Sequence, residues 1–331
     1  MPSTVPEVEL DGQYRALREE AGYLPRERAC LLVRGADAPE YLQGQLTNEI
    51  EALPPGRGCY AALLDRKGHI QADMRVLRLD QGRDRPSSAP ERAGSIWLDL
   101  EPGAAPETLK HLRTYSIGRE VEVEDVSERW AITSLIGPRA AELAGVDGLG
   151  PEYGQRFREA DGIEMLAVAT DLGVDAITRP EQAESLRRRL ADAGAAAVSE
   201  DAAEIVRVES GRPRFGLDMD RGLMPAEAGI TDRAVSFEKG CYIGQEPVAR
   251  LHYRGKPNRR LRGLRLSATA ERGDPLRLGD REVGEIGTAV LSPSLGPIAL
   301  AVIRREAEEG DQLSVGDMVA TAEVVELPFA A

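Results

Sequence analysis

The sequence reads Phe237-Glu238-Lys239-Gly240-Cys241-Tyr242-Ile243-Gly244-Gln245-Glu246-Pro247-Val248-Ala249-Arg250 at the point that most decides what this chain is. Two glycines, a thiol, a lysine, an amide, an arginine and carboxylates occur together within this stretch. Glycine lets a backbone approach a ligand closely, and polar and reactive groups at this density are unfavourable in a core. The stretch, which we call the 237–250 motif, therefore predicts a binding loop.

The 237–250 motif begins the strongly basic part of an acidic chain. The whole chain has 42 Lys and Arg against 56 Asp and Glu, a formal net charge of −14, but residues 239–265 contain one acid, Glu246. This contrast predicts an anionic ligand or partner for the first four basic residues of the region, Lys239, Arg250, Arg254 and Lys256. From Arg259 onward the arginines alternate with apolar residues, which favours a strand with its charges in solvent.

Length and composition limit the number of domains and the kinds of site and partner that this protein can have. A chain of 331 residues is long enough for two or three domains and a large core without disulfides. Its three cysteines and three histidines are scattered, so we expect no self-contained metal site. The first residues contain neither a basic head nor an apolar run, which predicts a cytoplasmic protein with no membrane contact. The acidity disfavours general nucleic-acid binding.

The pattern of apolar residues predicts an α+β fold. Alternation and β-branched residues predict early strands, and Pro39 and Pro106 mark helices, the first with a capping-box pattern at Asp37-Ala38-Pro39-Glu40. Two further helices are expected, one near Pro180 and one capped by Ser199. The early strands are expected at 29–34, 58–64, 70–79, 95–100, 120–126 and 130–136, and later ones at 164–170 and 174–177.

The last part of the chain predicts a small antiparallel barrel or sandwich. Short strands cut by glycine and proline are expected at 261–266, 282–291, 297–303 and 319–327. We therefore expect an α+β region of two sub-domains over residues 1–255, with a mobile loop at about 81–94, and a β-barrel domain over 256–331. The 237–250 motif falls at the junction, where ligand sites often form.

Cys241 is the first candidate catalytic residue. Lys239 and a helix that begins soon afterwards favour the thiolate form of a nearby cysteine. The alternative is a small buried hydrophobe, the usual state of a free cysteine. Cys30 and Cys59 lie in apolar strands and are expected to be of this second kind.

Two carboxylates are further candidates. Glu209 ends a helix, where its two oxygens suit the paired N–H groups on the edge of a pterin or guanine ring; the alternative is an exposed acid paired with Arg207 or Arg212. Asp73 lies on the polar face of an alternating strand, where the ordinary interpretation is solvent exposure or an ion pair with Arg75. A functional Asp73 requires that this face line a cavity.

In these residues the chain resembles the YgfZ family of folate-binding iron-sulfur cluster assembly proteins. Members of this family are relatives of the glycine cleavage T-protein, which is an aminomethyltransferase. The Lys-Gly-Cys-Tyr-x-Gly-Gln-Glu pattern from Lys239 is typical of the YgfZ branch, since T-proteins lack the cysteine. The resemblance also rests on Gly35-Ala36-Asp37-Ala38 with Thr47-Asn48, on 68–73 and 121–126, on 207–218, and on Pro225-Ala226-Glu227-Ala228-Gly229, which is T-protein-like.

The resemblance implies a ring of three sub-domains around a central channel that holds tetrahydrofolate. Glu209 matches the pterin-binding glutamate, Tyr60 matches a tyrosine that lines the folate site, and Asp73 matches the second of two adjacent aspartates, the first being replaced by Ala72. Together with the 237–250 motif, this gives the expected cofactor-binding residues Glu209, Tyr60, Asp73, Lys239, Gly240, Gln245, Glu246 and Arg250.

Two functions stay open from the sequence. The leading hypothesis is a tetrahydrofolate-binding protein that supports assembly or repair of iron-sulfur clusters in client enzymes, including tRNA-modifying enzymes, with Cys241 as the functional thiol. The alternative is a folate-dependent aminomethyltransferase or methyltransferase in which Asp73 acts as base or electrostatic stabiliser. A third, weaker hypothesis uses Arg250 to Arg265 to contact tRNA directly.

Overall fold

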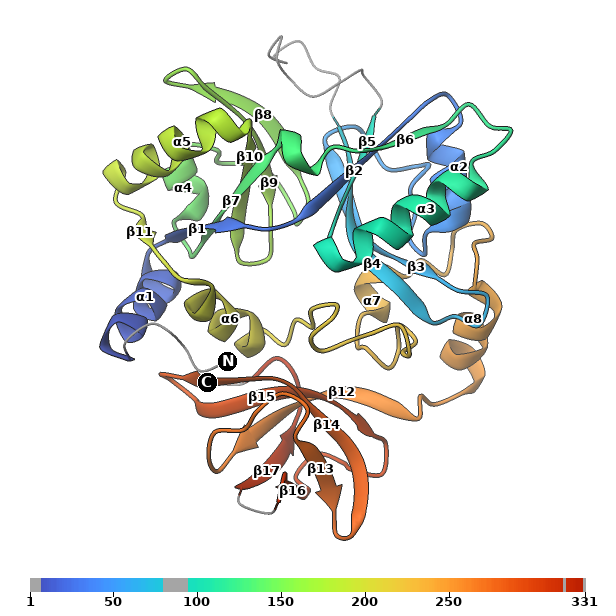
Figure 1. Ribbon diagram of the computed structural model, residues 1–331, viewed down its shortest axis with the longest axis vertical. Coiled ribbons are helices and arrows are strands. Elements are labelled where there is room, and N and C mark those ends of the chain that lie inside the picture. The colour runs from blue at the N-terminus through green and yellow to red at the C-terminus, as the bar shows by residue number, and fades with distance from the viewer. Residues whose placement is uncertain (1–6, 80–94, 318–319, 330–331) are drawn as a thin grey trace.

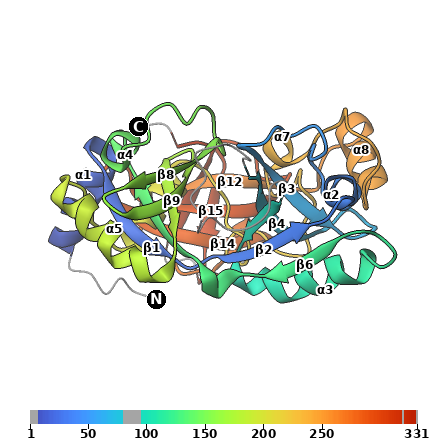
Figure 2. The ribbon, with the colours of Figure 1, turned by 90° about the horizontal axis from the view of Figure 1, so that it is seen from above.

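The computed structural model describes residues 7–79, 95–317 and 320–329. The loop predicted at 81–94 lies outside the described residues. Figure 1 shows two β-sheets side by side above a β-barrel. Seen from above, helices α1 (Glu7–Glu19) and α5 (Pro180–Asp192) lie at one end, and α2 (Ala38–Gln45) and α8 (Gln245–Arg254) lie at the other (Figure 2).

The first sheet has five strands in the order β3-β4-β5-β2-β6, each antiparallel to its neighbours. In β4 the residues alternate between buried and half-buried, because one face packs on the core while the other bears Gln71, Asp73 and Arg75. The strands span Ala29–Arg34 (β2), Arg57–Leu64 (β3), Ile70–Arg78 (β4), Ile96–Leu100 (β5) and Glu122–Asp125 (β6).

The second sheet has six strands in the order β11-β1-β7-β10-β9-β8. Its pairs are antiparallel except that β1 runs parallel to the short β11. Fully buried leucines, among them Leu135 and Leu186, pack this sheet against α5. The strands span Gly22–Arg26 (β1), Ala131–Ile136 (β7), Gln155–Ala160 (β8), Ile163–Ala169 (β9), Gly173–Thr178 (β10) and Ala196–Ala197 (β11).

The chain crosses between the two sheets twice. It enters the six-stranded sheet with β1, builds the whole five-stranded sheet from β2 to β6, and returns to the six-stranded sheet with β7. Since β1 pairs directly with β7, the N-terminal strand is held in place by residues that come after the other sheet. The two sheets are therefore interleaved in sequence.

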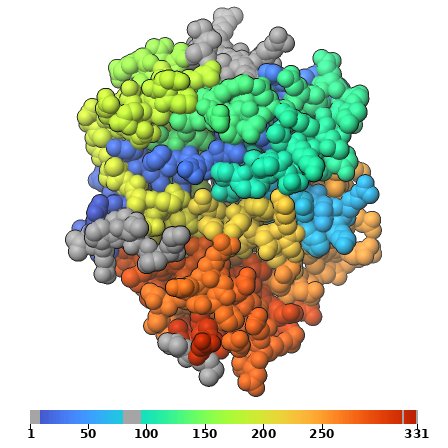
Figure 3. All heavy atoms as spheres, viewed as in Figure 1, coloured from blue at the N-terminus to red at the C-terminus, as the bar shows by residue number. Residues whose placement is uncertain are grey.

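The barrel is closed by strands in the order β12-β15-β14-β13-β16-β17, all antiparallel. In β12 the leucines are buried, as the alternation predicts, whereas the arginines, which were predicted to lie in solvent, are half-buried. The strands span Arg259–Leu266 (β12), Pro275–Leu278 (β13), Arg281–Ser292 (β14), Gly296–Arg304 (β15), Gln312–Val315 (β16) and Ala320–Val325 (β17). In Figure 3 the segment that follows α6 (Glu200–Glu209) fills the band between the barrel and the sheets.

Local signals explain where several helices begin. Ser199 caps α6, where its hydroxyl accepts a hydrogen bond from the Ala202 N–H at 3.3 Å, and Pro180 occupies the first turn of α5. The capping box predicted at Asp37 is wrong: the Asp37 side chain accepts from the backbone N–H of Glu120 instead, although α2 does form. The remaining helices span Ala105–Tyr115 (α3), Ala140–Ala144 (α4) and Thr231–Ala234 (α7), with short 3-10 turns at Pro102–Ala104 and Ser127–Arg129.

The predicted α+β fold with a C-terminal antiparallel barrel is confirmed. The observed strands match the predicted ones within a few residues at their ends. The sequence pattern did not indicate α1, α4, α7, β1, β8, β11, β13 or β16. The predicted division of the chain at residue 255 stays a prediction; in the structure α8 ends at Arg254 and the first barrel strand begins at Arg259.

Candidate functional site

A cavity of about 630 Å3 lies where the two sheets meet the segment that follows α6. Its wall is built from β3 and β4 of one sheet, β7 and β10 of the other, α6, α7 and connecting segments. This volume is within the range of about 300–1,000 Å3 that is usual for small-molecule sites. We call it the central cavity.

One buried aspartate holds two arginines of the cavity wall. Asp99 of β5 accepts from the Nε atom of Arg28 at 2.6 Å and from the Nε atom of Arg75 at 2.7 Å. Arg75 also pairs with Asp175 of β10, which joins the two sheets across the cavity. Burial opposes the charge on Arg75, but the attraction of both aspartates outweighs it and raises the pKa of Arg75 above its usual range.

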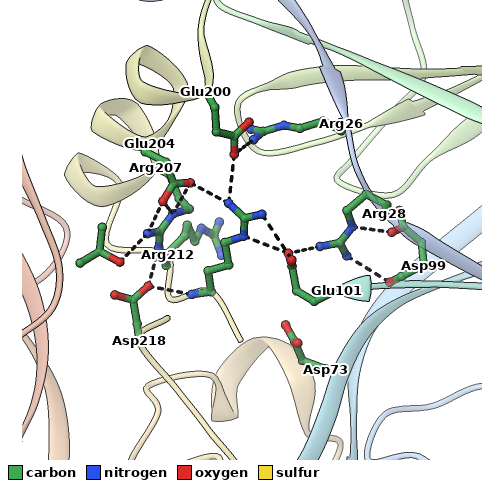
Figure 4. Close-up of polar contacts among 12 residues, drawn as sticks. Arg26, Arg28, Asp73, Asp99, Glu101, Glu200, Glu204, Arg207, Arg212 and Asp218 are labelled. Atoms are coloured by element: carbon green, nitrogen blue, oxygen red, sulfur yellow. Dashed lines mark hydrogen bonds and ion pairs between the residues drawn. The ribbon is translucent and has the colours of Figure 1, made fainter. Parts of the chain in front are cut away.

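A second group of ion pairs continues along the wall. Arg214 donates from Nε to Glu101 at 3.2 Å and from Nη1 to Glu200 at 3.0 Å. Arg207 donates from Nη2 to Glu204 at 2.8 Å. Glu200, Glu204 and Arg207 are spaced by four and three residues, so they share the face of α6 that lines the cavity. Figure 4 shows these contacts as a continuous network of paired charges.

Asp73 stands outside this network, as Figure 4 shows. Its Oδ2 atom accepts a hydrogen bond from the Tyr60 hydroxyl at 2.6 Å, and its Oδ1 atom is buried with no hydrogen-bond partner within the described residues. Burial raises the pKa of Asp73, while the Tyr60 hydrogen bond opposes this shift. The predicted ion pair with Arg75 does not form, because Arg75 is bound to Asp99 and Asp175. The polar face of β4 does line a cavity.

Tyr60 connects Asp73 to a cation. The guanidinium carbon of Arg233, from α7, lies 4.9 Å from the centre of the Tyr60 ring. The Asn48 side-chain amide donates to the backbone carbonyls of both Tyr60, at 2.8 Å, and Arg233, at 3.0 Å. Asn48 therefore fixes the aromatic ring and the cation relative to each other.

Arg233 is held from the other sheet. Its Nη2 atom donates to Glu152 at 2.6 Å and to the hydroxyl of Tyr153 at 2.8 Å. Tyr153 is one of the few residues other than glycine with a positive φ angle, +66°. Close by, Arg212 pairs with Asp171 at 2.8 Å and lies 4.0 Å from Glu152. All five residues line the central cavity.

Glu209 does not line the central cavity. Its carboxylate is 6 % exposed and accepts hydrogen bonds from Tyr14 at 3.0 Å and from Ser292 at 2.5 Å, between α1, α6 and the barrel. The alternative of an exposed acid paired with Arg207 or Arg212 is wrong. In this position Glu209 joins the barrel to the sheets.

Lys239 binds backbone carbonyls at the end of α2. Its side chain is buried, and its Nζ atom donates to the backbone carbonyls of Gln43 at 2.5 Å and Leu46 at 2.6 Å, at the end of α2. Burial lowers the pKa of Lys239 to about 8. A cation at this end of a helix meets unpaired carbonyls and the negative end of the helix dipole. The lysine therefore anchors the 237–250 motif to α2, outside the central cavity.

Cys241 is exposed, so the alternative of a buried hydrophobe is excluded. It lies between Gly240, which is also exposed, and the buried Tyr242. Cys30 is buried, as expected, whereas Cys59 is half-buried. The structure does not bring Cys241 to the central cavity.

The rest of the 237–250 motif positions α8. Gly244 has a φ angle of +83°, and a Cβ atom there would lie 2.4 Å from the carbonyl oxygen of Asp65, in the turn between β3 and β4. Gln245 begins α8, and Glu246 pairs with Arg250 at 3.0 Å on the exposed face of this helix. None of these four motif residues lines the central cavity.

A smaller cavity of about 310 Å3 lies beside α8, lined mainly by apolar side chains such as Phe237, Val248 and Leu251. Arg254 and Lys256 are exposed nearby in sequence and make no ion pair within the described residues. Of the residues that the sequence assigned to one cofactor site, Tyr60 and Asp73 line the central cavity, whereas Glu209 and the residues of the 237–250 motif do not.

Several residues of the central cavity were not predicted. The sequence offered Arg212 only as a partner of Glu209 and Arg214 only within the 207–218 segment of the resemblance, and it did not indicate Glu152, Asp171 or Arg233. The glycines at 148, 150 and 154 are the one visible signal for the loop that bears Glu152. Nothing in the sequence marks Arg233, because its position depends on how α7 packs on β3.

The described residues contain neither a membrane-spanning helix nor a group of side chains suited to a metal ion. None of the helices in this part of the chain is long and apolar enough to cross a membrane. Over the same ranges, no three side chains of His, Cys, Asp or Glu gather in a group suited to a metal ion.

Family comparisons cover most of the chain. The family model described as GCVT N-terminal domain matches residues 11–239, and the model described as glycine cleavage T-protein C-terminal barrel domain matches residues 259–330. The first match includes every residue named in the wall of the central cavity, and the second covers the barrel.

Individual relatives agree with this match. An aminomethyltransferase of Rubrobacter xylanophilus is 30% identical over 97% of this chain and 86% of its own length. A putative chloroplastic transferase of Arabidopsis thaliana is 26% identical over 90% of this chain and 68% of its own length. Among solved structures, the glycine cleavage system aminomethyltransferase T of Bartonella henselae superposes with a TM-score of 0.84 at 22% identity, over 100% of this chain and 91% of that one, which shows the same fold.

Proposed function

Because the chain belongs to the glycine cleavage T-protein family, we propose that it is a tetrahydrofolate-dependent one-carbon transferase of the aminomethyltransferase type. The observation that carries this proposal is Asp73, a half-buried side chain that forms no ion pair within the described residues, with one oxygen fixed by Tyr60 and the other buried and unbonded in the wall of the central cavity. A carboxylate in this state suits a reaction in which positive charge or a labile proton appears beside it.

Tetrahydrofolate suits the central cavity by size and by the chemistry of the wall. Tyr60 and Phe215 offer aromatic surfaces, and Asp171 offers a carboxylate that pairs, among the described residues, with Arg212. A carboxylate of this kind can accept the paired N–H groups of a pterin edge. We therefore propose Asp171 for this contact. The assignment of Glu209 stays a prediction from the resemblance, and it requires that Glu209 leave its present hydrogen bonds.

Bound tetrahydrofolate would supply the nitrogen that accepts the one-carbon unit. The contribution of the protein is electrostatic and positional. The Oδ1 atom of Asp73 holds or removes a proton at the reacting nitrogen and stabilises positive charge on the carbon being transferred. Because burial raises the pKa of Asp73, this carboxylate is a stronger base than an exposed aspartate. Tyr60 keeps the other oxygen out of the reaction.

The first test is calorimetric titration of tetrahydrofolate, without oxygen, into the wild type, Asp171→Asn and Glu209→Gln. We expect the wild type to bind, Asp171→Asn to bind at least tenfold more weakly, and Glu209→Gln to bind as the wild type does once its folding is verified. Loss of affinity in Glu209→Gln alone would support the assignment from the resemblance instead.

The second test separates binding from chemistry. Asp73→Asn is expected to bind tetrahydrofolate within about threefold of the wild type and to lose at least a hundredfold in one-carbon transfer, measured as methylene-tetrahydrofolate from an aminomethylated carrier or as methyl-tetrahydrofolate from a small methylated amine. A protein that binds tetrahydrofolate and transfers nothing with either class of donor would contradict the transferase function.

A second function, support of iron-sulfur cluster assembly or repair in client enzymes including tRNA-modifying enzymes, is proposed on one observation. The thiol of Cys241 is exposed on the outside of the protein, where a client protein can reach it. In this function tetrahydrofolate still binds in the central cavity, and Cys241 meets the client. The cavity and the thiol are then two separately testable sites.

Cells that lack the gene, complemented with variants, distinguish the two functions. If cluster maintenance is the main role, Cys241→Ala will fail to restore client-enzyme activity and Asp73→Asn will restore it. If one-carbon transfer is the main role, the outcomes are reversed. Normal client-enzyme activity with Cys241→Ala would rule out the proposed role of the thiol.

A further inference from the structure

We infer that the outer surface beside α8 docks a protein partner, which inserts an apolar side chain of a short acidic segment into a groove. The groove is the smaller cavity of about 310 Å3, and we call it the α8 groove. It shares no lining residue with the central cavity, and α8 lies at one end of the molecule (Figure 2). The inference goes beyond the proposed function and is independent of which of the two functions is correct.

The lining of the α8 groove is mainly apolar. Phe237 and Leu251 are half-buried, so part of their apolar surface is open to solvent, while Val248 is buried. Covering such a surface is favourable. The volume is at the low end of the range of about 300–1,000 Å3 for small-ligand sites, which suits one or two apolar side chains. The apolar lining residues include Met224, Ala226, Phe237, Val248, Leu251 and Pro257.

Two cations border this apolar lining. Helix α8 ends at Arg254, and the next residues alternate: Gly255 and Pro257 line the groove, and Lys256 lies between them. Arg254 and Lys256 are exposed, and neither forms an ion pair within the described residues. Cations without a partner beside an apolar groove attract carboxylates.

An aromatic cluster stands on the same side of α8. The ring of Phe237 stacks on that of His252 with their centres 3.9 Å apart, and the ring of Tyr253 lies edge-on to both, at 5.9 Å and 4.8 Å. Tyr253 is 68% exposed. An exposed tyrosine next to an apolar groove with a basic border has the composition of a binding hot spot. The stacking holds Phe237 in place before a partner arrives.

One acid restricts how a segment can bind. Asp232 of α7 is the one acid among the described residues that line the groove, and it is exposed without an ion pair in the same ranges. Its charge repels the carboxylates of a segment. The acids of the partner must therefore lie toward Arg254 and Lys256, away from Asp232.

The number of cations favours a protein partner over a nucleic acid. Proteins that bind nucleic acid through its backbone neutralise several phosphates, often about 6–10. The α8 groove is bordered by two unpaired cations within the described residues, on a chain whose formal net charge is −14. Two or three carboxylates match that supply, and the apolar lining gives the segment its anchor.

The experiment selects ligands for the full-length protein from a phage-displayed library of random dodecapeptides. Ala226→Trp serves for counter-selection, because Ala226 lines the groove and a large ring there fills it. We expect the enriched peptides to share an apolar residue with Asp or Glu within a few positions. By fluorescence anisotropy, synthetic copies should bind Ala226→Trp at least tenfold more weakly than the wild type, and Tyr253→Ala at least fivefold more weakly.

Charge substitutions at exposed positions test the basic border. Arg254→Glu with Lys256→Glu should weaken the same peptides at least tenfold. The matched control is Arg15→Glu with Lys110→Glu, which makes the same change in net charge on α1 and α3 and should leave the affinity within about twofold. Asp232→Asn should tighten the peptides about threefold. If Ala226→Trp does not fold, these opposite shifts test the same groove.

A selection that enriches no peptide over the counter-selection, or peptides that bind the wild type and the Arg254→Glu, Lys256→Glu variant equally, would overturn the inference. Tighter binding of a random single-stranded RNA than of the peptides would assign the surface to nucleic acid and overturn it too. Asp73→Asn and Cys241→Ala should bind the peptides as the wild type does. Weaker binding in Cys241→Ala would mean that the thiol, and not the α8 groove, makes the contact.

Discussion

The hydroxyl of Tyr60 on β3 lies 2.6 Å from the Oδ2 atom of Asp73 on the neighbouring strand β4. In the register of these strands Asp73 lies opposite Ala62, two residues from Tyr60, so the two side chains are diagonal neighbours on one face of the sheet. The small side chain of Ala62 leaves the space in which they meet. This pairing determines which oxygen of the carboxylate is available to a ligand.

Tyr60→Phe removes this hydrogen bond and keeps the ring. Because the phenol stabilises the ionised carboxylate, its loss raises the pKa of Asp73 further. We expect the acid limb of the pH profile of kcat to move to higher pH and kcat at neutral pH to fall about tenfold, with folate affinity little changed. A profile that stays in place while kcat falls would show that Tyr60 acts only through packing.

Asp73→Asn should stabilise the protein at neutral pH. The pKa of Asp73 in the folded protein is above its value in the unfolded chain, so the wild type loses stability as the pH rises through the folded-state pKa. The variant lacks this loss and should gain about 0.5–2 kcal/mol at pH 8 relative to the wild type, and less at pH 4.

Urea unfolding at the two pH values checks this result. Asp175→Asn is the matched control, because it breaks the ion pair with Arg75 and leaves that cation only Asp99, which it shares with Arg28. That variant should lose about 3–5 kcal/mol. Destabilisation of Asp73→Asn at pH 8 would mean that the carboxylate supports the fold rather than the reaction.

Glu209→Ala should destabilise the protein by about 2–4 kcal/mol, because it leaves the hydroxyls of Tyr14 and Ser292 without their acceptor in a buried site. Glu246→Ala is the control: Glu246 also lies in a helix, but its ion pair with Arg250 is exposed and should contribute less than about 1 kcal/mol. Thermal and urea unfolding measure both. Equal stability of the two variants would contradict the structural role of Glu209.

Two glycines of the 237–250 motif should respond differently to alanine. Gly244→Ala places a methyl group 2.4 Å from the carbonyl of Asp65 in a left-handed backbone conformation and should cost about 1–3 kcal/mol. A Cβ atom on Gly240 meets nothing within 4 Å, so Gly240→Ala should be neutral for stability. If Gly240→Ala instead impairs function while the protein stays folded, Gly240 takes part in binding.

Thiol labelling should single out Cys241. Burial raises the pKa of Cys59 to about 12 and that of Cys30 still further, so neither forms a thiolate near neutral pH. A colorimetric disulfide reagent should therefore react rapidly with one thiol in the native wild type and with none in Cys241→Ala, and with all three once the protein is unfolded. Rapid reaction of a second thiol in the native protein would indicate that the β3 edge opens.

The sequence alone predicted the helices and strands better than it predicted which residues lie against them. Alternation placed Asp73 on the polar face of a strand, but whether that face meets solvent or a cavity depends on the opposite sheet, whose strand β10 comes about a hundred positions later. Similarly, Arg75 was assigned to Asp73 by closeness in sequence, and its real partners come from β5 and β10.

The period of an α-helix indicates on which side of α6 Glu209 lies. Glu200, Glu204 and Arg207 share one face of α6, and Glu209 lies two residues further on, which places it on the other side. Once the first three are assigned to the cavity, the helical period directs Glu209 towards α1 and the barrel. The role of Lys239 could not be found in this way, because the carbonyls that it binds belong to the end of a distant helix.

The double crossing of the chain sets an order of events during synthesis. At about 5–20 residues per second, β1 emerges from the ribosome several seconds before β7, the strand with which it pairs. By the end of that interval the five-stranded sheet has all of its strands and can fold. At this stage β1 and α1 still form an unpaired N-terminal arm. The cavity wall is therefore completed late, when the returning chain joins that arm. A nascent protein halted before residue 131 has Asp73 and Tyr60 but lacks β7 and every later part of the cavity wall.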